Sequence, residues 1–191
     1  MMKKLLLALA VSAALVPGAL AQSGLRETPQ GFCSLGSLAS AVKVTTTNCV
    51  FGSFTGVLAG NVLTVSSLTG SILPGQVLVG TGVAANTFIT GQVTGTPGAA
   101  GLYQVNNAQT VASESMTTAG IPFNSSYAVI CASTQAVNYR DDLSVPTGTA
   151  GSGGQFIPAA QCIGYNGPLG NLQFIQQAAT AVLGISFYTS P

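Results

Sequence analysis

Histidine and tryptophan are absent from this sequence, and charged residues make up 5% of its 191 positions, against about 25% in an average soluble domain. Five Lys+Arg residues cannot build a surface that neutralises a phosphate backbone, which argues against a nucleic-acid binder. A mean hydropathy of +0.52 with so little charge also argues against intrinsic disorder. The 47% hydrophobic residues and 24 glycines instead indicate one or two small domains with many turns.

The scarcity of titratable side chains also bears on catalysis. Without histidine, a serine or threonine nucleophile would depend on Lys43 or a carboxylate as its base. Asp141 and Asp142 are adjacent, so on a strand they would point to opposite faces and could not form an acid–base pair. The glycine-rich stretch 147–154 lacks the lysine of a phosphate-binding loop and is interpreted as a linker-like loop. We therefore expect no enzyme activity and no cofactor.

The first 21 residues have the organisation of a signal peptide. A basic start at Lys3-Lys4 precedes an apolar stretch over 5–15, and Ala19-Leu20-Ala21 offers small residues for cleavage before Gln22. The stretch is too short for a bilayer, which needs about 20 apolar residues. No later run is long and apolar enough, so we expect no stable membrane span. An N-terminal core helix is the alternative interpretation of this leader.

Four cysteines follow the leader: Cys33, Cys49, Cys131 and Cys162. An even count behind an export signal favours two disulfides formed in an oxidising compartment, with three possible connectivities. We favour Cys33–Cys49 with Cys131–Cys162, because each pair closes a modest loop. A zinc site would need all four thiolates from scattered positions, so we expect no metal site. Four buried free thiols are the alternative.

Cleavage of the leader would also change the charge balance. The remaining chain would hold three basic and four acidic side chains, which gives a net charge of −1. Such a nearly neutral surface carries little electrostatic repulsion and tends to associate. We therefore expect a homo-oligomer.

Short apolar and β-branched stretches between turn residues predict an all-β fold. Residues 22–32 are interpreted as a polar lead-in, and Thr45–Thr47 favours a strand. Val57-Leu58 and 62–65 flank Ala59-Gly60-Asn61, which predicts a hairpin. Further strands are expected over 76–79, 87–93, 102–105, 110–116, 127–131, 136–139, 172–176 and 182–188.

The C-terminal stretch allows two interpretations. Residues 173–181 could form a short helix, since Phe174, Ala178 and Ala181 are apolar at suitable spacing. A hairpin of strands 172–176 and 182–188 is favoured, because residues 183–187 alternate as a strand does.

The residues Tyr139, Arg140, Asp141 and Asp142 form the one dense polar feature and hold three of the seven charges behind the leader. In so apolar a chain, Arg140 is expected to make a charge-assisted hydrogen bond to a carboxylate, either locally or on a neighbouring subunit. Three interpretations follow: a salt-bridged strand end that fixes the next loop, a subunit or receptor contact, or a calcium site at the two aspartates.

Several stretches of the middle segment resemble, in order, a module common in structural proteins of tailed bacteriophages. That module reads G-x-x-L-T-V, G-x-x-L-x-G-x-G-V, T-x-I, G-x-Y-x-V and Q-T-V-A-S-x-x-M/I-T. The matching residues are 60–65, 75–83, 87–89, 101–105 and 109–117. The resemblance implies a small β-module over about 54–120.

A second resemblance covers 127–142 and 154–188, which look like a small virion-associated domain of phages. Its V-x-Y-R-D-D strand end matches 137–142, and its A-x-Q-C-x-x-Y turn matches 159–165. Residues 35–41 look like that domain's first strand. The resemblance implies a β-sandwich or jelly-roll-like domain, split into 22–53 and 121–191 by the inserted module.

The two resemblances imply a non-enzymatic virion structural protein that decorates the surface of a head, neck or tail. Its partners would be other virion proteins, further copies of itself and, through the exposed inserted module, a glycan or protein of the bacterial surface. The signal peptide and the even cysteine count favour an alternative, a secreted periplasmic or cell-surface adhesin-like protein of prophage origin. An enzyme acting on polysaccharide is disfavoured, because that class needs paired carboxylates.

Overall fold

The structure of the chain is a computed structural model that describes residues 27–36 and 38–189, and in this part the fold is all-β, as predicted. The expected leader, residues 1–21, lies outside the described residues. The strands are β1 (Thr28–Leu35), β2 (Val42–Lys43), β3 (Val50–Gly70), β4 (Leu78–Val79), β5 (Ile89–Thr94), β6 (Gly101–Ala119), β7 (Tyr127–Ala132), β8 (Val137–Arg140), β9 (Gln155–Ile157), β10 (Gln161–Tyr165), β11 (Gln173–Gln176) and β12 (Leu183–Thr189). One 3₁₀ turn, η1 (Leu169–Asn171), is the only helical element in this range. Within it, no helix is long and apolar enough to cross a membrane.

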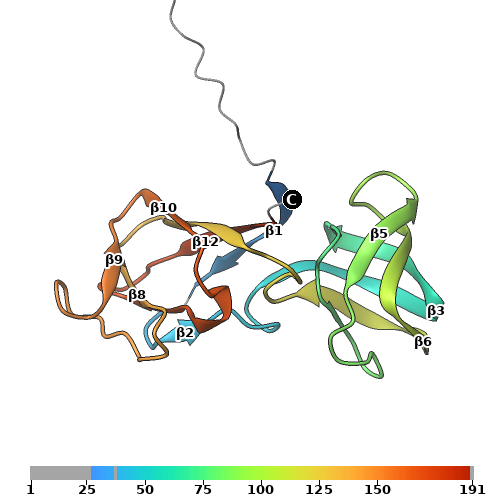
Figure 1. Cartoon of the computed structure of the whole chain (residues 1–191), viewed down its shortest axis with the longest axis horizontal. Coiled ribbons are helices and arrows are strands. Elements are labelled where there is room, and N and C mark those ends of the chain that lie inside the picture. Colours follow the sequence, from blue (N-terminus) through green and yellow to red (C-terminus); the bar gives the residue numbers. More distant parts are fainter. Residues whose placement is uncertain (1–26, 37, 190–191) are drawn as a thin grey trace, which may run out of the picture.

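Two four-stranded antiparallel sheets form one lobe, here called the sandwich (Figure 1). The first sheet has the order β1-β12-β7-β10, and the second has the order β2-β11-β8-β9. Their inner faces share one hydrophobic core, in which Ile130, Phe174 and Leu183 are fully buried. Strand β12 shows why: its residues alternate between buried and half-buried, the pattern of a strand with one face on a core. A jelly-roll strand order is not established by this topology.

The other lobe, the inserted module, is built on the long strands β3 and β6, with β4 and β5 paired to β6. It has a hydrophobic core of its own, which begins at Phe54, whereas Phe51 still belongs to the core of the sandwich. Tyr103 lies fully buried at its centre, and its hydroxyl donates a 2.5 Å hydrogen bond to the Ala99 carbonyl. Figure 1 shows the two lobes side by side, connected by β3 and β6.

The hairpin expected at Ala59-Gly60-Asn61 is present in a modified form, because both of its arms belong to the single strand β3. Gly60 has a φ of +64°, and β3 changes its register with β6 between Gly60 and Val62. The far end of β3 then returns beside its beginning, since the Ser66 hydroxyl donates to the Thr55 carbonyl. The two strands expected at 102–105 and 110–116 are likewise parts of one strand, β6.

Other elements differ from the sequence-based expectation. Thr45–Thr47 is a turn and not a strand, because the Asn48 carboxamide accepts from the Thr45 amide and the Cys49 amide donates to the Thr45 carbonyl. The polar lead-in 22–32 already contains the first half of β1. Residues 136–139 were expected to form a half-exposed strand, but Val137–Tyr139 are all buried, since a loop covers the outer face of β8.

The C-terminal stretch forms strands and no helix, yet its two strands do not form the expected hairpin. Strand β11 pairs with β2 and β8, whereas β12 pairs with β1 and β7. The chain therefore crosses from one sheet to the other between Gln176 and Leu183. Thr180, in this crossing, has a φ of +68°, a left-handed conformation that belongs to a turn.

Two disulfides lie in the sandwich, with the pairing favoured from the loop lengths. Cys33 of β1 is bonded to Cys49, just before β3, and both are buried. Cys131 of β7 is bonded to Cys162, which is its direct partner in the register of β10, and Cys162 is exposed. One bond therefore lies inside the lobe and the other on its surface.

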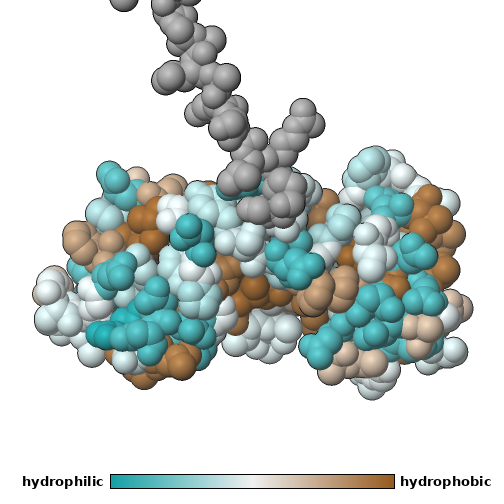
Figure 2. All heavy atoms as spheres, in the orientation of Figure 1, coloured by the Kyte–Doolittle hydropathy of each residue, from teal (hydrophilic) through white to brown (hydrophobic). Residues whose placement is uncertain are grey.

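The two lobes meet through glutamine side chains. Gln30 of β1 is buried, donates to the Phe123 carbonyl at 3.0 Å and accepts from the Ser125 hydroxyl at 2.6 Å. Gln76 of the inserted module is fully buried and donates at 2.9 Å to the main-chain carbonyl of Gln30. The Phe123 amide also donates to the Gly75 carbonyl at 2.6 Å. Figure 2 shows apolar side chains gathered where the lobes meet.

Candidate functional site

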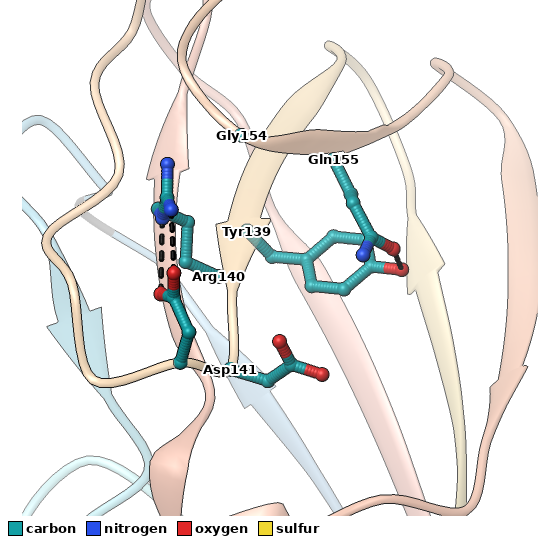
Figure 3. A pocket seen from close by; sticks show the side chains of 6 residues that line it. Tyr139, Arg140, Asp141, Gly154 and Gln155 are labelled. Carbon is teal, nitrogen blue, oxygen red and sulfur yellow. Dashed lines mark hydrogen bonds and ion pairs between the residues drawn. The ribbon is translucent and has the colours of Figure 1, made fainter.

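The polar residues 139–142, here called the β8 cluster, lie at the end of β8 around an open hollow of about 230 Å³ (Figure 3). Arg140 and Tyr139 point to opposite sides of the strand, because neighbouring side chains alternate across a sheet. Gly154 and Gln155, at the start of β9, complete the lining of the hollow. The hollow is therefore lined by the end of β8, the two residues that follow it and the start of β9.

Arg140 pairs with Asp142 of the same chain, the local of the two kinds of partner expected. Its Nε and Nη2 donate to the two carboxylate oxygens at 3.0 and 2.5 Å, a bidentate arrangement. The Ser144 amide also donates to this carboxylate, at 3.1 Å. The bonds from Arg140 and then from Ser144 hold the pKa of Asp142 well below its ordinary value. The ion pair thus fixes the first turn of the loop that leaves β8.

Asp141 faces a different partner, the hydroxyl of Tyr165 on β10, which donates to it at 3.0 Å. Burial, the hydrogen bond to Asp141 and the charge of Asp141 raise the pKa of Tyr165 to about 12. Burial and the same charge raise the pKa of Tyr139, whose hydroxyl donates to the Gln155 side chain at 2.5 Å. Both tyrosines therefore stay protonated near neutral pH and act as hydrogen-bond donors.

Two amide side chains hold the loop 141–154 against the outer face of the second sheet, and a third supports one of them. The Asn138 amide nitrogen donates to the carbonyls of Thr147 and Thr149 at 2.7 and 3.0 Å. Gln177 donates to the Asn138 oxygen, and Gln173 donates to carbonyls at the start of the loop. The stretch 147–154, interpreted from sequence as linker-like, is thus tied to the sheet at several points.

The loop presents apolar side chains beside the ion pair. Leu143 and Val145 are 63% and 65% exposed, and Leu143 has a φ of +67°, which is rare for a branched residue. Phe156 of β9 is 56% exposed. An ordered loop with exposed apolar side chains beside an ion pair is suited to contact with another macromolecule. The two carboxylates of the β8 cluster do not face each other, because Asp142 is bonded to Arg140 and Asp141 to Tyr165.

A metal site has no support among the described residues. They contain no group of three or more His, Cys, Asp or Glu side chains that could hold an ion. The two aspartates of the β8 cluster are bonded to Arg140 and Tyr165, and all four cysteines lie in disulfides. The calcium and zinc interpretations therefore find no ligand set in this part of the chain.

Comparison with protein-family models, with curated proteins and with solved structures finds no match to this chain.

The junction between the lobes is a second candidate site, one that the sequence did not single out. Gln30, Gln76, Phe88 and Phe123 are far apart in the sequence and come together only in the fold. The Pro74-Gly75 pair, which is typical of a turn, was the one signal of this junction in the sequence. In the structure Gly75 has a φ of +90° and its turn contacts Gln30. A Cβ atom at Gly75 would lie 2.1 Å from Nε2 of the Gln30 side chain.

Proposed function

We propose that the protein is a non-enzymatic structural protein of a bacteriophage virion, which decorates a head, neck or tail surface through the sandwich and presents the inserted module. The sequence resemblances described above suggest this class of protein. The disulfides are of the kind that form in oxidising compartments, so the protein is one that matures outside the reducing cytoplasm, as secreted and extracellular proteins do.

The observation that carries the proposal is the way in which the inserted module is joined to the sandwich. The chain leaves and re-enters through paired residues, since Val50 lies opposite Ala119 and Gly52 opposite Thr118. Each lobe has its own core, and the buried Gln30–Gln76 contact fixes one against the other. A rigidly held second lobe of this kind is suited to presentation, with one lobe anchored and the other displayed.

The β8 cluster supplies a surface for the anchoring contact. The bidentate Arg140–Asp142 pair fixes a loop whose Leu143 and Val145 are exposed, and aromatic or aliphatic side chains next to a charged rim are typical of interfaces. The surface belongs to the sandwich and not to the inserted module. This division is consistent with an anchored sandwich.

The location of the protein tests this proposal directly. Particles released by the cells that make the protein are banded in a density gradient and examined by mass spectrometry and by immunogold labelling. We expect the chain in the particle band at a fixed ratio to the major particle proteins. Its recovery only from the unsedimented fraction would refute the virion role.

A deletion variant tests the division between the lobes. Because Gly52 and Thr118 are directly opposed, Asn-Gly in place of residues 53–117 can close the strands with a two-residue turn. We expect the shortened protein to keep both disulfides and to remain in the particle band. A matched control carries L143S and V145S in the full chain and is expected to leave the band. If the folded deletion variant is absent from the particle band while this control remains in it, the inserted module and not the sandwich would be the anchoring lobe.

A second candidate function is a secreted bacterial surface protein, and the two disulfides favour it. The intact mass of the native protein separates the two. A chain that begins at Gln22, carries two disulfides and occurs without particles supports the secreted protein. A disulfide-bonded chain found in the particle band supports the virion protein and indicates that it is added after export.

A further inference from the structure

An open groove of about 260 Å³ lies where the two lobes meet, here called the interlobe groove. One wall comes from the ends of β1 and β12 in the sandwich, and the other comes from the Pro74-Gly75 turn and the start of β5. Phe123 and Asn124, on the segment that returns from β6 to β7, lie between them. Ligand sites are found preferentially at such junctions between domains.

Two aromatic rings give the groove a flat apolar surface. Phe88 and Phe123 stack with centroids 4.0 Å apart and an interplanar angle of 10°. Phe123 is nonetheless 46% exposed. Its backbone is held on both sides, since its amide donates to Gly75 and its carbonyl accepts from Gln30. The orientation of this ring is therefore set before any ligand arrives, which lowers the entropy cost of binding.

Polar side chains without partners surround the aromatic pair. Thr28, Thr90 and Asn124 border the groove, and their side chains make no hydrogen bond with other described residues. Gln30, by contrast, is engaged at both its nitrogen and its oxygen. The groove thus combines a ring surface with hydroxyl and amide groups that are available to a ligand.

No charged side chain of the described residues lines the groove. A phosphate, sialate or uronate ligand would therefore lose its hydration without gaining a cation, which is costly. Nucleotide bases also stack on aromatic rings, but their phosphates need basic partners that are absent here. A neutral sugar ring fits both features, since its C–H face can pack on Phe123 while its hydroxyls bond to the threonines and Asn124.

We propose that the interlobe groove binds a neutral saccharide, with Phe123 as the stacking surface and Thr28, Thr90 and Asn124 as hydrogen-bonding groups. The saccharide is the bacterial-surface partner in the proposed function, so the biological meaning of the site rests on that function. Binding itself is a property of the purified chain. It is measured without particles, and so it can fail or succeed independently of the virion role.

The test uses the ¹⁵N-labelled full mature chain with both disulfides formed. Three neutral probes, tetra-N-acetylchitotetraose, cellotetraose and maltotetraose, and one anionic probe, 3′-sialyllactose, are titrated to about 10 mM, which reaches the weak affinities usual for small ligands. We expect at least one neutral probe to shift the amide signals of Phe88, Thr90, Phe123 and Asn124 in a saturable way. The anionic probe is expected to leave them unchanged.

Two matched variants decide whether the ring is the binding surface. F123A removes the exposed ring of the groove, and F156A removes an exposed ring of β9, 56% accessible and on the sandwich. We expect F123A to weaken saccharide binding by about tenfold or more, and F156A to leave it unchanged. The dispersion of the amide spectrum shows for each variant that the fold is retained.

Several outcomes would overturn the proposal. These are the absence of saturable shifts at the groove with all three neutral probes, preference for sialyllactose, and equal binding by F123A and the natural chain. Shifts at Phe123 that depend on protein concentration alone would instead assign the groove to a second copy of the chain. A folded F123A variant that is retained in particles and yet no longer binds saccharide would show that attachment to the particle does not depend on the groove.

Discussion

The buried disulfide Cys33–Cys49 allows a quantitative prediction about stability. The bond joins residues separated by 16 positions, and it connects β1 to the beginning of β3. Closing a loop of this length in the unfolded chain is expected to stabilise the fold by about 3 kcal/mol. C33A/C49A should therefore lower the free energy of unfolding by about that amount, which corresponds to a fall in Tm of about 6–12 °C for a chain of this size.

Urea denaturation followed by tyrosine fluorescence measures this loss in the sandwich, the lobe that contains the bond. The chain has no tryptophan, and four of its five tyrosines lie in the sandwich, namely Tyr127, Tyr139, Tyr165 and Tyr188. Tyr103 alone reports on the inserted module. The transition of the sandwich should move to lower urea, whereas a Tyr103 signal isolated by NMR should move less. A loss below about 1 kcal/mol would refute the loop-closure reasoning.

The second disulfide provides the contrast. Cys131–Cys162 spans 31 positions, so the same reasoning gives a similar or slightly larger stabilisation. Cys162 is exposed, whereas Cys33 and Cys49 are 4% and 0% exposed. Under native conditions, dithiothreitol should therefore open Cys131–Cys162 first, because exchange needs access of a thiolate to the sulfur. Alkylation followed by peptide mass spectrometry gives the order, and opening of Cys33–Cys49 first would contradict the structure.

Three further predictions concern single side chains. The buried Thr118 hydroxyl has no hydrogen-bond partner among the described residues, so T118V should raise the free energy of unfolding in urea by about 1 kcal/mol. A fall in that free energy would show that the hydroxyl is satisfied. Gly70 has a φ of +91°, and a Cβ atom there would lie 2.2 Å from the Phe51 carbonyl oxygen. G70A should therefore destabilise the inserted module by at least about 2 kcal/mol in thermal unfolding. The raised pKa of Tyr165, about 12, favours the neutral form in the folded state, so its contribution to stability is complete below pH 10 and is lost as the pH rises from 10 through 12. Absorbance at 295 nm should show this late ionisation, and D141N should bring it to lower pH.

Much of the architecture follows from local signals in the sequence. The alternation in 183–187 and the apolar run at 127–131 predict strands because one face of each lies on the core. Loop length was enough to favour the observed pairing of the cysteines. The Arg140–Asp142 bond was also predictable from the sequence, because its two partners are two positions apart and few other charges compete.

The remaining features depend on contacts that a linear pattern does not carry. Thr45–Thr47 has β-branched residues, yet Asn48 closes a turn there by accepting from the main chain. Asn138 looks like the exposed position of an alternating strand, but a loop that begins three residues later covers it. The interlobe groove depends on Phe88 and Phe123, which are 35 positions apart and meet only when both lobes have folded. The strand propensities of single residues do not encode such long-range packing.

The opposed positions Gly52 and Thr118 also bear on how such a chain can change over time. A gene segment that codes for any small domain with closely spaced ends could be exchanged at this point by recombination, with little effect on the surrounding strands. Residues such as Gln30 would then be the first to adapt, because they contact whatever is grafted there. The sandwich could in this way carry different second lobes while its own strands and core stay constant.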